Sequence, residues 1–294
     1  MNIYLFGASS FSGQSFIDCC KYSRKNLNLY LYSRNRKDNF KLDLKEPSTF
    51  NPNNKDKFII VSFAPIWELS YFFEILSDKF KNRLQQLQGI VVCSSSSVIT
   101  KRFESNSFDK DLFKKLYSAE TKLLKISNEL KISCSIIRPT MIYDSYPNSR
   151  DKNISKILSI MRILRLLILP SRTGLRQPIH SSQLANVFLK MVEDTIQNKY
   201  FQVVLNVGGD NLLTYEEMIT SLRDSIDVSD KASKCKIIRL PNRLFNFLCS
   251  PLLLFSPKTF SSIKRIGSDL SGFQKASEIT KKDLRFFPIL KDYF

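Results

Sequence analysis

The chain has 294 residues, of which 43% are hydrophobic, and its 45 Lys and Arg against 27 Asp and Glu give a formal net charge of +18. This length and apolar content indicate a globular protein, either one large α/β domain or a domain with a smaller lobe. The charge favours an anionic partner, such as a nucleotide or an acidic membrane surface; the alternative is a solvated basic face with no macromolecular partner. Because no helix-turn-helix, zinc-finger or RNP-type pattern accompanies it, we expect no nucleic-acid partner.

The cysteines and the N-terminus bear on location. The six cysteines show neither a C-x-x-C pair nor zinc-ligand spacing, which favours buried free thiols and no metal site. Residue 2 already begins an apolar run, with no secretory leader pattern ahead of it. We therefore expect a cytoplasmic protein.

The strongest motif lies in the first thirteen residues. Residues 2–6 predict a buried parallel strand, and Gly7 and Gly13 follow with Ser10 midway and a helix after them. This order presents free backbone N–H groups and the positive end of a helix dipole to a pyrophosphate. It predicts that Gly7, Ser10, Phe11 and Gly13 bind a dinucleotide. The alternative is a tight turn with no ligand.

The end of the second predicted strand indicates which dinucleotide. Residues 28–32 form that strand, and Ser33 and Arg34 follow it. An acidic side chain at this place bonds a ribose 2′-hydroxyl, whereas Arg suits a 2′-phosphate. No Asp or Glu lies between Tyr30 and Lys37, so we predict NADP, with NAD as second choice, and Ser33 and Arg34 as contacts. A basic surface turn is the alternative.

Strands and helices alternate through the first half of the chain. Further buried strands are predicted at residues 58–63, 89–93 and 134–137, and helices at residues 67–79 and 109–130. The alternation predicts a doubly wound, Rossmann-like α/β fold, with Ala64 at a strand end beside the adenine. We expect a dinucleotide-binding core over 1–150. We expect 151–294 to be mainly a substrate lobe, with one core segment returning at about 174–205.

Three further stretches resemble a known family. Ser-Ser-Ser at 94–96 ends a strand, Arg-Pro-x-x-x-Tyr at 138–143 ends another, and Arg-Gln-Pro-Ile-His at 176–180 precedes a helix. Together with the glycine turn they resemble the extended and atypical short-chain dehydrogenase/reductases of the NAD-dependent epimerase/dehydratase group. The resemblance covers essentially the whole chain. It implies an NAD(P)-dependent oxidoreductase or epimerase that acts on a nucleotide-sugar, in surface-polysaccharide synthesis.

The resemblance also implies a catalytic Ser/Thr, Tyr and Lys. Ser96 matches the residue that hydrogen-bonds the reacting oxygen. The family's Tyr and Lys lie four residues apart on one helical face, where the lysine lowers the tyrosine pKa. Tyr117 and Lys122 are five residues apart, which places them about 140° apart around a helix, so they do not reproduce the pair.

Leucines occupy the two matched positions. Counting back from Arg138, with Glu120 matched to a family Glu, puts Leu112 and Leu116 at the Tyr and Lys positions. One account is that another group supplies the proton; the candidates are Tyr117, Tyr143 and Lys101. The other account is a non-catalytic NADP-binding sensor or assembly protein that has lost the pair.

In the C-terminal region the resemblance implies two substrate contacts. Asn153 matches an Asn that contacts the nucleotide-sugar, and Arg176 matches an Arg that clamps its diphosphate, a role suited to a planar five-donor guanidinium. His180 is the only histidine, and a structural role is expected for it. Gln183 stands where the family usually has Asp.

Local patterns predict the remaining elements of this region. We expect a strand at 201–205 and a capping box at residues 214–217 that opens a helix. A packed or interfacial helix is expected at 244–255. A helix over 154–169, apolar apart from three cations and two serines, is expected to pack against the sheet. Alternatively, this helix and the basic C-terminal segment lie on an anionic membrane surface.

Overall fold

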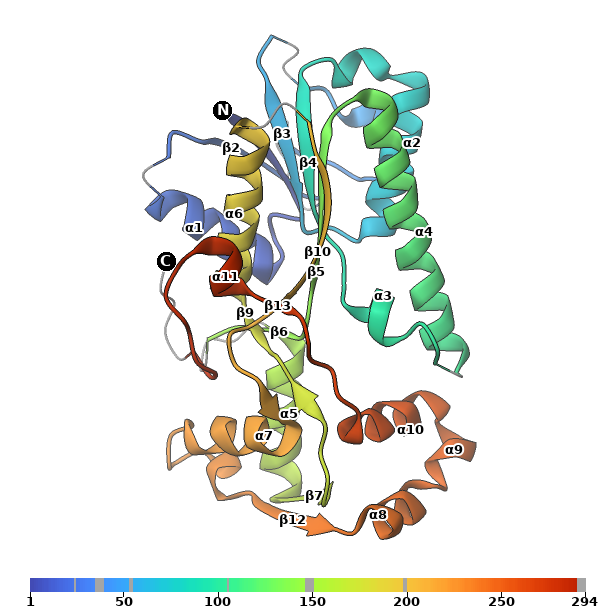
Figure 1. Cartoon of the computed structure of the whole chain (residues 1–294), viewed down its shortest axis with the longest axis vertical. Helices are drawn as coiled ribbons and strands as arrows, with labels where there is room; N and C mark the ends of the chain where they lie inside the picture. The colour runs from blue at the N-terminus through green and yellow to red at the C-terminus, as the bar shows by residue number, and fades with distance from the viewer. Residues whose placement is uncertain are drawn as a thin grey trace.

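Seven parallel strands form the central sheet, in the spatial order β13-β10-β5-β4-β3-β1-β2 (Figure 1). The computed structural model describes residues 1–23, 25–34, 40–52, 55–104, 106–145, 151–197 and 200–289. The strands of this sheet are β1 (Asn2–Phe6), β2 (Asn28–Tyr32), β3 (Phe58–Ser62), β4 (Leu87–Cys93), β5 (Ser133–Pro139), β10 (Gln202–Gly208) and β13 (Gln274–Lys275). The predicted doubly wound α/β fold is confirmed.

Helices cover both faces of the sheet. Helices α1 (Phe11–Tyr22) and α6 (Ser181–Gln197) pack together on one face, and α2 (Ile66–Lys79) and α4 (Ser107–Leu130) on the other (Figure 1). Short elements between them are η1 (Pro47–Thr49), η2 (Lys81–Leu84) and α3 (Ser97–Thr100).

The opening strand shows how the sequence makes this layering. All five residues of β1 are buried, as expected for a strand covered on both faces. Ile3 and Leu5 belong to the apolar core beneath α1 and α6, whereas Tyr4 and Phe6 belong to the core beneath α2 and α4. This alternation follows from the two-residue period of a strand.

A smaller lobe follows the carboxyl ends of the strands (Figure 1). Its helices are α5 (Lys152–Leu164), α7 (Tyr215–Asp224), α8 (Asn242–Cys249), α9 (Leu252–Phe255) and α10 (Pro257–Lys264), with η3 (Lys231–Lys234) and η4 (Arg265–Gly267). Three pairs of short strands accompany them: β6 (Ile142–Tyr143) with β9 (Ile179–His180), β7 (Leu166–Pro170) with β12 (Lys236–Leu240), and β8 (Leu175–Arg176) with β11 (Leu213–Thr214). Helix α11 (Ala276–Thr280) returns to the core and packs on α6.

The helix predicted over 154–169 is wrong in its second part. Helix α5 ends at Leu164, because Arg165 adopts a left-handed φ of 51°. The next five residues form β7, which runs parallel to β12 with Leu166 beside Lys236. The apolar run therefore serves two elements, and the strand partner lies far along the chain where local periodicity gives no signal.

The capping box predicted at residues 214–217 is confirmed. Thr214 caps α7, accepting from the amide of Glu217, whose carboxylate accepts from the Thr214 amide at 2.7 Å. The apolar stretch at 244–255 forms two helices, α8 and α9, separated at Pro251, instead of the single helix predicted. Within the described residues, which include all six cysteines, every thiol is free. No helix in the same part of the chain combines the length and the apolar character needed to cross a membrane.

Candidate functional site

A pocket of about 230 Å³ lies at the carboxyl ends of β1, β2 and β3. Five of the seven residues predicted to bind the cofactor line it: Gly7, Ser10, Ser33, Arg34 and Ala64. The other two, Phe11 and Gly13, lie in the first turn of α1, directly after Ser10. The site is therefore at the edge of the sheet where parallel α/β folds bind their ligands.

The two glycines allow three segments to meet behind this pocket. Gly7 has a φ of +74°, and a Cβ there would lie 2.8 Å from the backbone nitrogen of Ala64. A Cβ on Gly13 would lie 2.5 Å from the carbonyl oxygen of Gly7. Side chains at either position would force β1, α1 and the loop after β3 apart.

Ser10 closes the turn with its own side chain. Its hydroxyl donates to the carbonyl oxygen of Gly7 at 2.8 Å and accepts from the amide of Gly13 at 3.0 Å. Ser10 is thus the N-cap of α1, a position that serine favours. The hydroxyl is held by the turn rather than directed outward as a phosphate donor.

Two backbone amides at the start of α1 have no hydrogen-bond acceptor among the described residues. Among the first N–H groups of the helix region, Ser10 donates to the Gly7 carbonyl and Gly13 donates to the Ser10 hydroxyl. In the described part of the chain, no hydrogen bond is found for the amides of Phe11 and Ser12. The first turn also carries no acidic residue. Unbonded amides at the positive end of a helix dipole are an arrangement that can hold an anion.

The far side of the pocket is built by the segment after β2. The amide of Leu42 donates to the carbonyl oxygen of Ser33 at 3.2 Å, so this segment folds back along the strand end. Leu42 and Leu44 are buried and line the pocket. Arg34 is exposed at the rim, and no ion pair or hydrogen bond of its side chain is found among the described residues.

Two pocket residues with ionisable side chains, Glu68 and Tyr32, were not predicted. Glu68, in the first turn of α2, contributes a carboxylate. Tyr32 contributes a phenol, and its burial, together with Tyr4 and Tyr30 nearby, raises its pKa so that it stays protonated. Glu68 could have been found from its place, three residues after Pro65, which precedes α2 at the carboxyl end of the β3 segment.

The serine run after β4 is anchored by a buried ion pair. The Ser94 hydroxyl donates to Glu120, which is 2% exposed and accepts from Arg138 Nε at 3.0 Å. The amide of Ser96 donates to the Pro139 carbonyl at 3.0 Å. No bond of the Ser96 hydroxyl is found within the described residues, which leaves it available to a ligand at the strand ends.

The positions matched to the family's Tyr and Lys lie in the core. Leu116 is 3% exposed and belongs to the apolar cluster under α2 and α4, and Leu112 packs against the same cluster. These side chains carry no proton to transfer. At the positions matched to the family's catalytic Tyr and Lys, helix α4 therefore packs on the core through two leucines.

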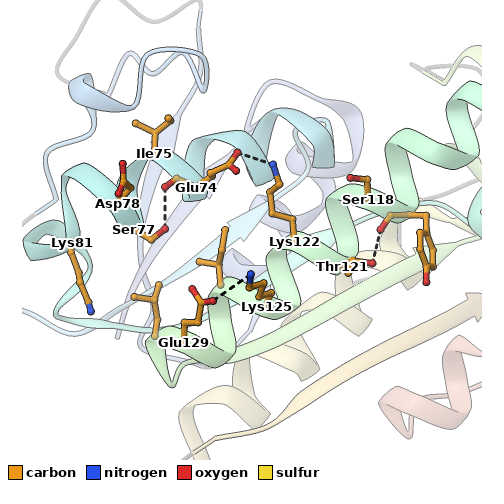
Figure 2. Close-up of a pocket in the computed structure, with 13 residues that line it drawn as sticks. Glu74, Ile75, Ser77, Asp78, Lys81, Ser118, Thr121, Lys122, Lys125 and Glu129 are labelled. Carbon is orange, nitrogen blue, oxygen red and sulfur yellow. Dashed lines mark hydrogen bonds and ion pairs between the residues drawn. The ribbon is translucent and has the colours of Figure 1, made fainter.

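Tyr117 lines a different pocket from the residues predicted to bind the cofactor. It is 54% exposed and lines a groove of about 890 Å³ between α2 and α4, shown in Figure 2. There Lys122 Nζ lies 2.7 Å from a Glu74 carboxylate oxygen (Figure 2). Among the described residues, this groove and the pocket at the glycine turn share no lining residue. Tyr117 as a proton donor thus lacks geometric support.

The other two candidate donors are engaged inside the protein. Lys101 Nζ pairs with the buried carboxylate of Asp109, which also lies 2.8 Å from Arg265 Nη1. The Tyr143 hydroxyl is buried and accepts from the amide of Ile289 at 3.3 Å. Burial raises the pKa of Tyr143, so its phenol stays protonated.

Arg176 is turned inward. The residue is 8% exposed, and its guanidinium donates to three backbone carbonyls, at 2.7 Å to Leu175, 2.7 Å to Ser268 and 2.5 Å to Arg265. It also lies 5.2 Å from the centre of the Tyr215 ring. These hydrogen bonds connect η4 to β8. The guanidinium donors are therefore used within the protein, whereas the sequence predicted that they bind a substrate diphosphate.

The remaining lobe residues have local partners. Asn153, exposed in the first turn of α5, donates to the Ile142 carbonyl at 3.1 Å. The His180 ring is buried, with Nδ1 2.7 Å from the Ser182 hydroxyl, as its expected structural role requires. Gln183 donates to Asp210 at 2.8 Å. Within the described residues, no group of His, Cys, Asp and Glu is arranged to hold a metal ion.

Comparison with known proteins gives structural matches only. No family model matches the sequence, and no curated protein matches it. The structure resembles a human epimerase family protein solved with NADPH, at a TM-score of 0.64 and 12% identity over 99% of this chain and 96% of that one. The chain shares the fold of this epimerase family protein.

Two bacterial structures agree with this fold. A UDP-glucuronic acid 4-epimerase from Bacillus cereus, in complex with NAD, matches with a TM-score of 0.61 and 13% identity over 97% of this chain and 92% of that one. A nucleoside-diphosphate-sugar epimerase from Staphylococcus aureus matches with a TM-score of 0.60 and 14% identity over 97% and 98%. At such identities the likeness concerns the fold.

Proposed function

We propose that this protein binds NADP at the carboxyl ends of β1, β2 and β3. The observation that carries the proposal is the pair of unbonded amides of Phe11 and Ser12 beside a pocket rimmed by Arg34. The amides and the helix dipole would hold the pyrophosphate. Arg34 would hold the 2′-phosphate, since a guanidinium suits a phosphate dianion.

The pocket fits the adenosine half of the cofactor. Leu42, Leu44 and Phe63 give it apolar walls, and Glu68 offers an acceptor for the adenine amino group. The nicotinamide half would extend along the strand ends toward Ser96. When bound, the cofactor would supply a hydride at the nicotinamide ring.

The choice of NADP over NAD rests on this chain's own residues. Among the structural neighbours, the human protein was solved with NADPH and the Bacillus cereus protein with NAD. Here β2 ends at Tyr32, and Ser33 and Arg34 follow it without an acidic side chain to accept bonds from a 2′-hydroxyl.

The protein's role is then that of an NADP-binding protein that does not use the family's proton-transfer pair. Leu112 and Leu116 pack against the core, and the candidates Lys101, Tyr117 and Tyr143 are engaged or lie elsewhere. A sensor or an assembly protein is consistent with these contacts.

One observation favours a second candidate, an oxidoreductase or epimerase that acts on a nucleotide-sugar in surface-polysaccharide synthesis. The Ser96 hydroxyl is available at the strand ends, and its backbone is fixed by Pro139. In this candidate Ser96 holds a sugar oxygen while hydride moves between the sugar carbon and the nicotinamide. The fold of the neighbouring epimerases supports it.

A single preparation tests both candidates. NADPH binding is measured by fluorescence titration, and NADPH oxidation is then followed by absorbance with a panel of nucleotide-4-keto-sugars. Saturable binding without oxidation supports the binding protein. Oxidation that Ser96→Ala reduces by about a hundredfold or more supports the enzyme. If the protein did not bind NADPH, both candidate functions would be contradicted.

A further inference from the structure

The end of the lobe combines positive charge with exposed apolar side chains, and NADP binding uses neither. Residues 231–268 contain eight Lys or Arg and no Asp or Glu. This segment includes β12, α8, α9 and α10. Figure 1 shows β12 and α8 at the end of the lobe that is farthest from the amino ends of the sheet strands, with α9 at the side of the lobe and α10 returning toward the core. We call α8, α9 and α10, with the outer face of β7 and β12, the basic lobe surface.

Helix α8 presents its apolar stripe to solvent. Leu244, Phe247 and Leu248 follow i, i+3, i+4 spacing and so share one helical face. They are 45%, 74% and 56% exposed, respectively. Phe245, on another face, is 6% exposed and attaches the helix to the lobe. A surface helix of a globular protein normally has the opposite arrangement, with its apolar stripe turned inward.

The next helices continue this pattern. In α9, Leu253 is 53% exposed and Phe255 is 84% exposed. In α10, Lys258 and Lys264 are exposed, and Arg243 is exposed on α8. Cations thus flank the exposed apolar side chains along the chain.

The paired strands β7 and β12 add a second exposed apolar patch. Ile168 lies beside Ile238 in the parallel register, so both side chains are on the same face of the ribbon. Each is 45% exposed. At the corner before β7, Ile163 is 77% exposed, and Arg165 beside it is exposed.

We propose that the basic lobe surface docks on an anionic lipid bilayer. Exposed Phe and Leu side chains would enter the boundary between head groups and acyl chains, while Lys and Arg are attracted to anionic head groups. With eight residues, α8 is far shorter than the roughly 20 needed to span a bilayer, so it lies in the interface.

Charge argues against the other obvious occupant, a second copy of this chain. A two-fold contact of this surface with itself would bring residues 231–268 of both copies together. This segment has eight Lys or Arg and no Asp or Glu, and two of the eight, Arg239 and Arg265, pair with Glu216 and Asp109 outside it. Like charges at an interface oppose association. An anionic bilayer is complementary to the same charges.

Vesicle flotation tests the proposal. The full-length protein is mixed with vesicles of phosphatidylcholine alone or with about 30% phosphatidylglycerol, at about 50 mM and 500 mM salt. We expect partition onto the anionic vesicles at low salt, and at least about tenfold less at high salt or on the neutral vesicles. The double variants Phe247→Ser/Phe255→Ser and Arg243→Glu/Lys258→Glu should each lower partition by about tenfold or more.

Matched substitutions elsewhere serve as controls. Tyr22→Ser changes a side chain on α1 that is 73% exposed, and Lys125→Glu reverses a charge on α4; neither should alter partition. Thermal melting shows that each variant is folded. Failure to float with anionic vesicles at low salt would overturn the proposal, as would wild-type partition of both double variants. So would a dimer in solution that Phe247→Ser/Phe255→Ser dissociates.

Discussion

The Ser10 hydroxyl lies 2.8 Å from the carbonyl oxygen of Gly7, and this contact closes the glycine turn from within. Because the same hydroxyl also caps Gly13, a side chain at the middle position of the turn does not need to occupy the space of a phosphate. The amides of Phe11 and Ser12 keep their hydrogen-bonding capacity for a ligand. The departure from the family's middle glycine is therefore compatible with dinucleotide binding.

The first prediction separates the capping role of Ser10 from ligand contact. Ser10→Ala should lower the free energy of unfolding by about 1 kcal/mol, because the Gly13 amide loses its acceptor. Ser10→Gly should cost only a few tenths of this and leave NADPH affinity within about threefold. Chemical unfolding and NADPH titration measure both effects. A tenfold loss of affinity in Ser10→Gly would show instead that the hydroxyl contacts the phosphate.

The second prediction concerns cofactor choice. Arg34→Ala should weaken NADPH binding by about tenfold or more and leave NADH binding unchanged, since a charged hydrogen bond to the 2′-phosphate is worth about 1.5–3 kcal/mol. Arg172→Ala, at an exposed arginine of the lobe, is the control. Equal losses for both cofactors would contradict the assignment of NADP.

The third prediction tests Arg176 as a fastening residue. Arg176→Lys should lower the free energy of unfolding by about 2 kcal/mol, because backbone carbonyls at Ser268 and Arg265 lose charged donors. NADPH affinity should not change. Urea unfolding and NADPH titration measure the two, with Arg172→Lys as control. If Arg176→Lys left the stability unchanged but abolished binding of a nucleotide-sugar, Arg176 would instead bind the substrate diphosphate.

The fourth prediction uses the buried carboxylate of Asp109. Burial by itself raises its pKa, but hydrogen bonds from Lys101, Asn106 and Arg265 outweigh burial and hold the pKa well below the ordinary 3.8. A lowered folded-state pKa contributes stability that is fully present above the ordinary value and is lost as pH falls toward the folded value. Asp109→Asn should therefore lower the free energy of unfolding by about 3 kcal/mol at pH 7.

The pH dependence gives this prediction its sign. The difference in the free energy of unfolding between wild type and Asp109→Asn should become smaller below about pH 4. At lower pH the wild-type carboxylate is protonated and no longer stabilises the fold. Unfolding curves at several pH values measure it. Asp111→Asn, at an exposed position of the same helix, should change stability by no more than about 0.5 kcal/mol. A difference that is constant from pH 7 to pH 3 would contradict the account.

Local patterns predicted the elements that depend on local physics. Strands β1 and β2 span the residues predicted, because a buried strand and a following turn leave a strong signal in a few residues. The glycine turn and the capping box of α7 were predicted for the same reason. These elements place the pocket, so its position follows from the sequence.

Long-range contacts could not be predicted. The carbonyls that bind Arg176 lie 89 and 92 residues further along the chain, so a matched position gave no sign of its inward orientation. Leu42 and Leu44 reach the pocket only because their segment folds back on β2. The strand β7 likewise depends on β12. The division at residue 150 stays a prediction.

The most direct test of dinucleotide binding removes one amide without breaking α1. Proline is tolerated at the first helical position, and Ser10, with φ −71° and ψ 154°, has the extended conformation that a following proline requires. Phe11→Pro deletes the amide and the ring, whereas Phe11→Ala deletes only the ring. The dissociation constant of NADPH should be about tenfold or more higher for Phe11→Pro than for Phe11→Ala. Equal constants for two folded variants would contradict the account.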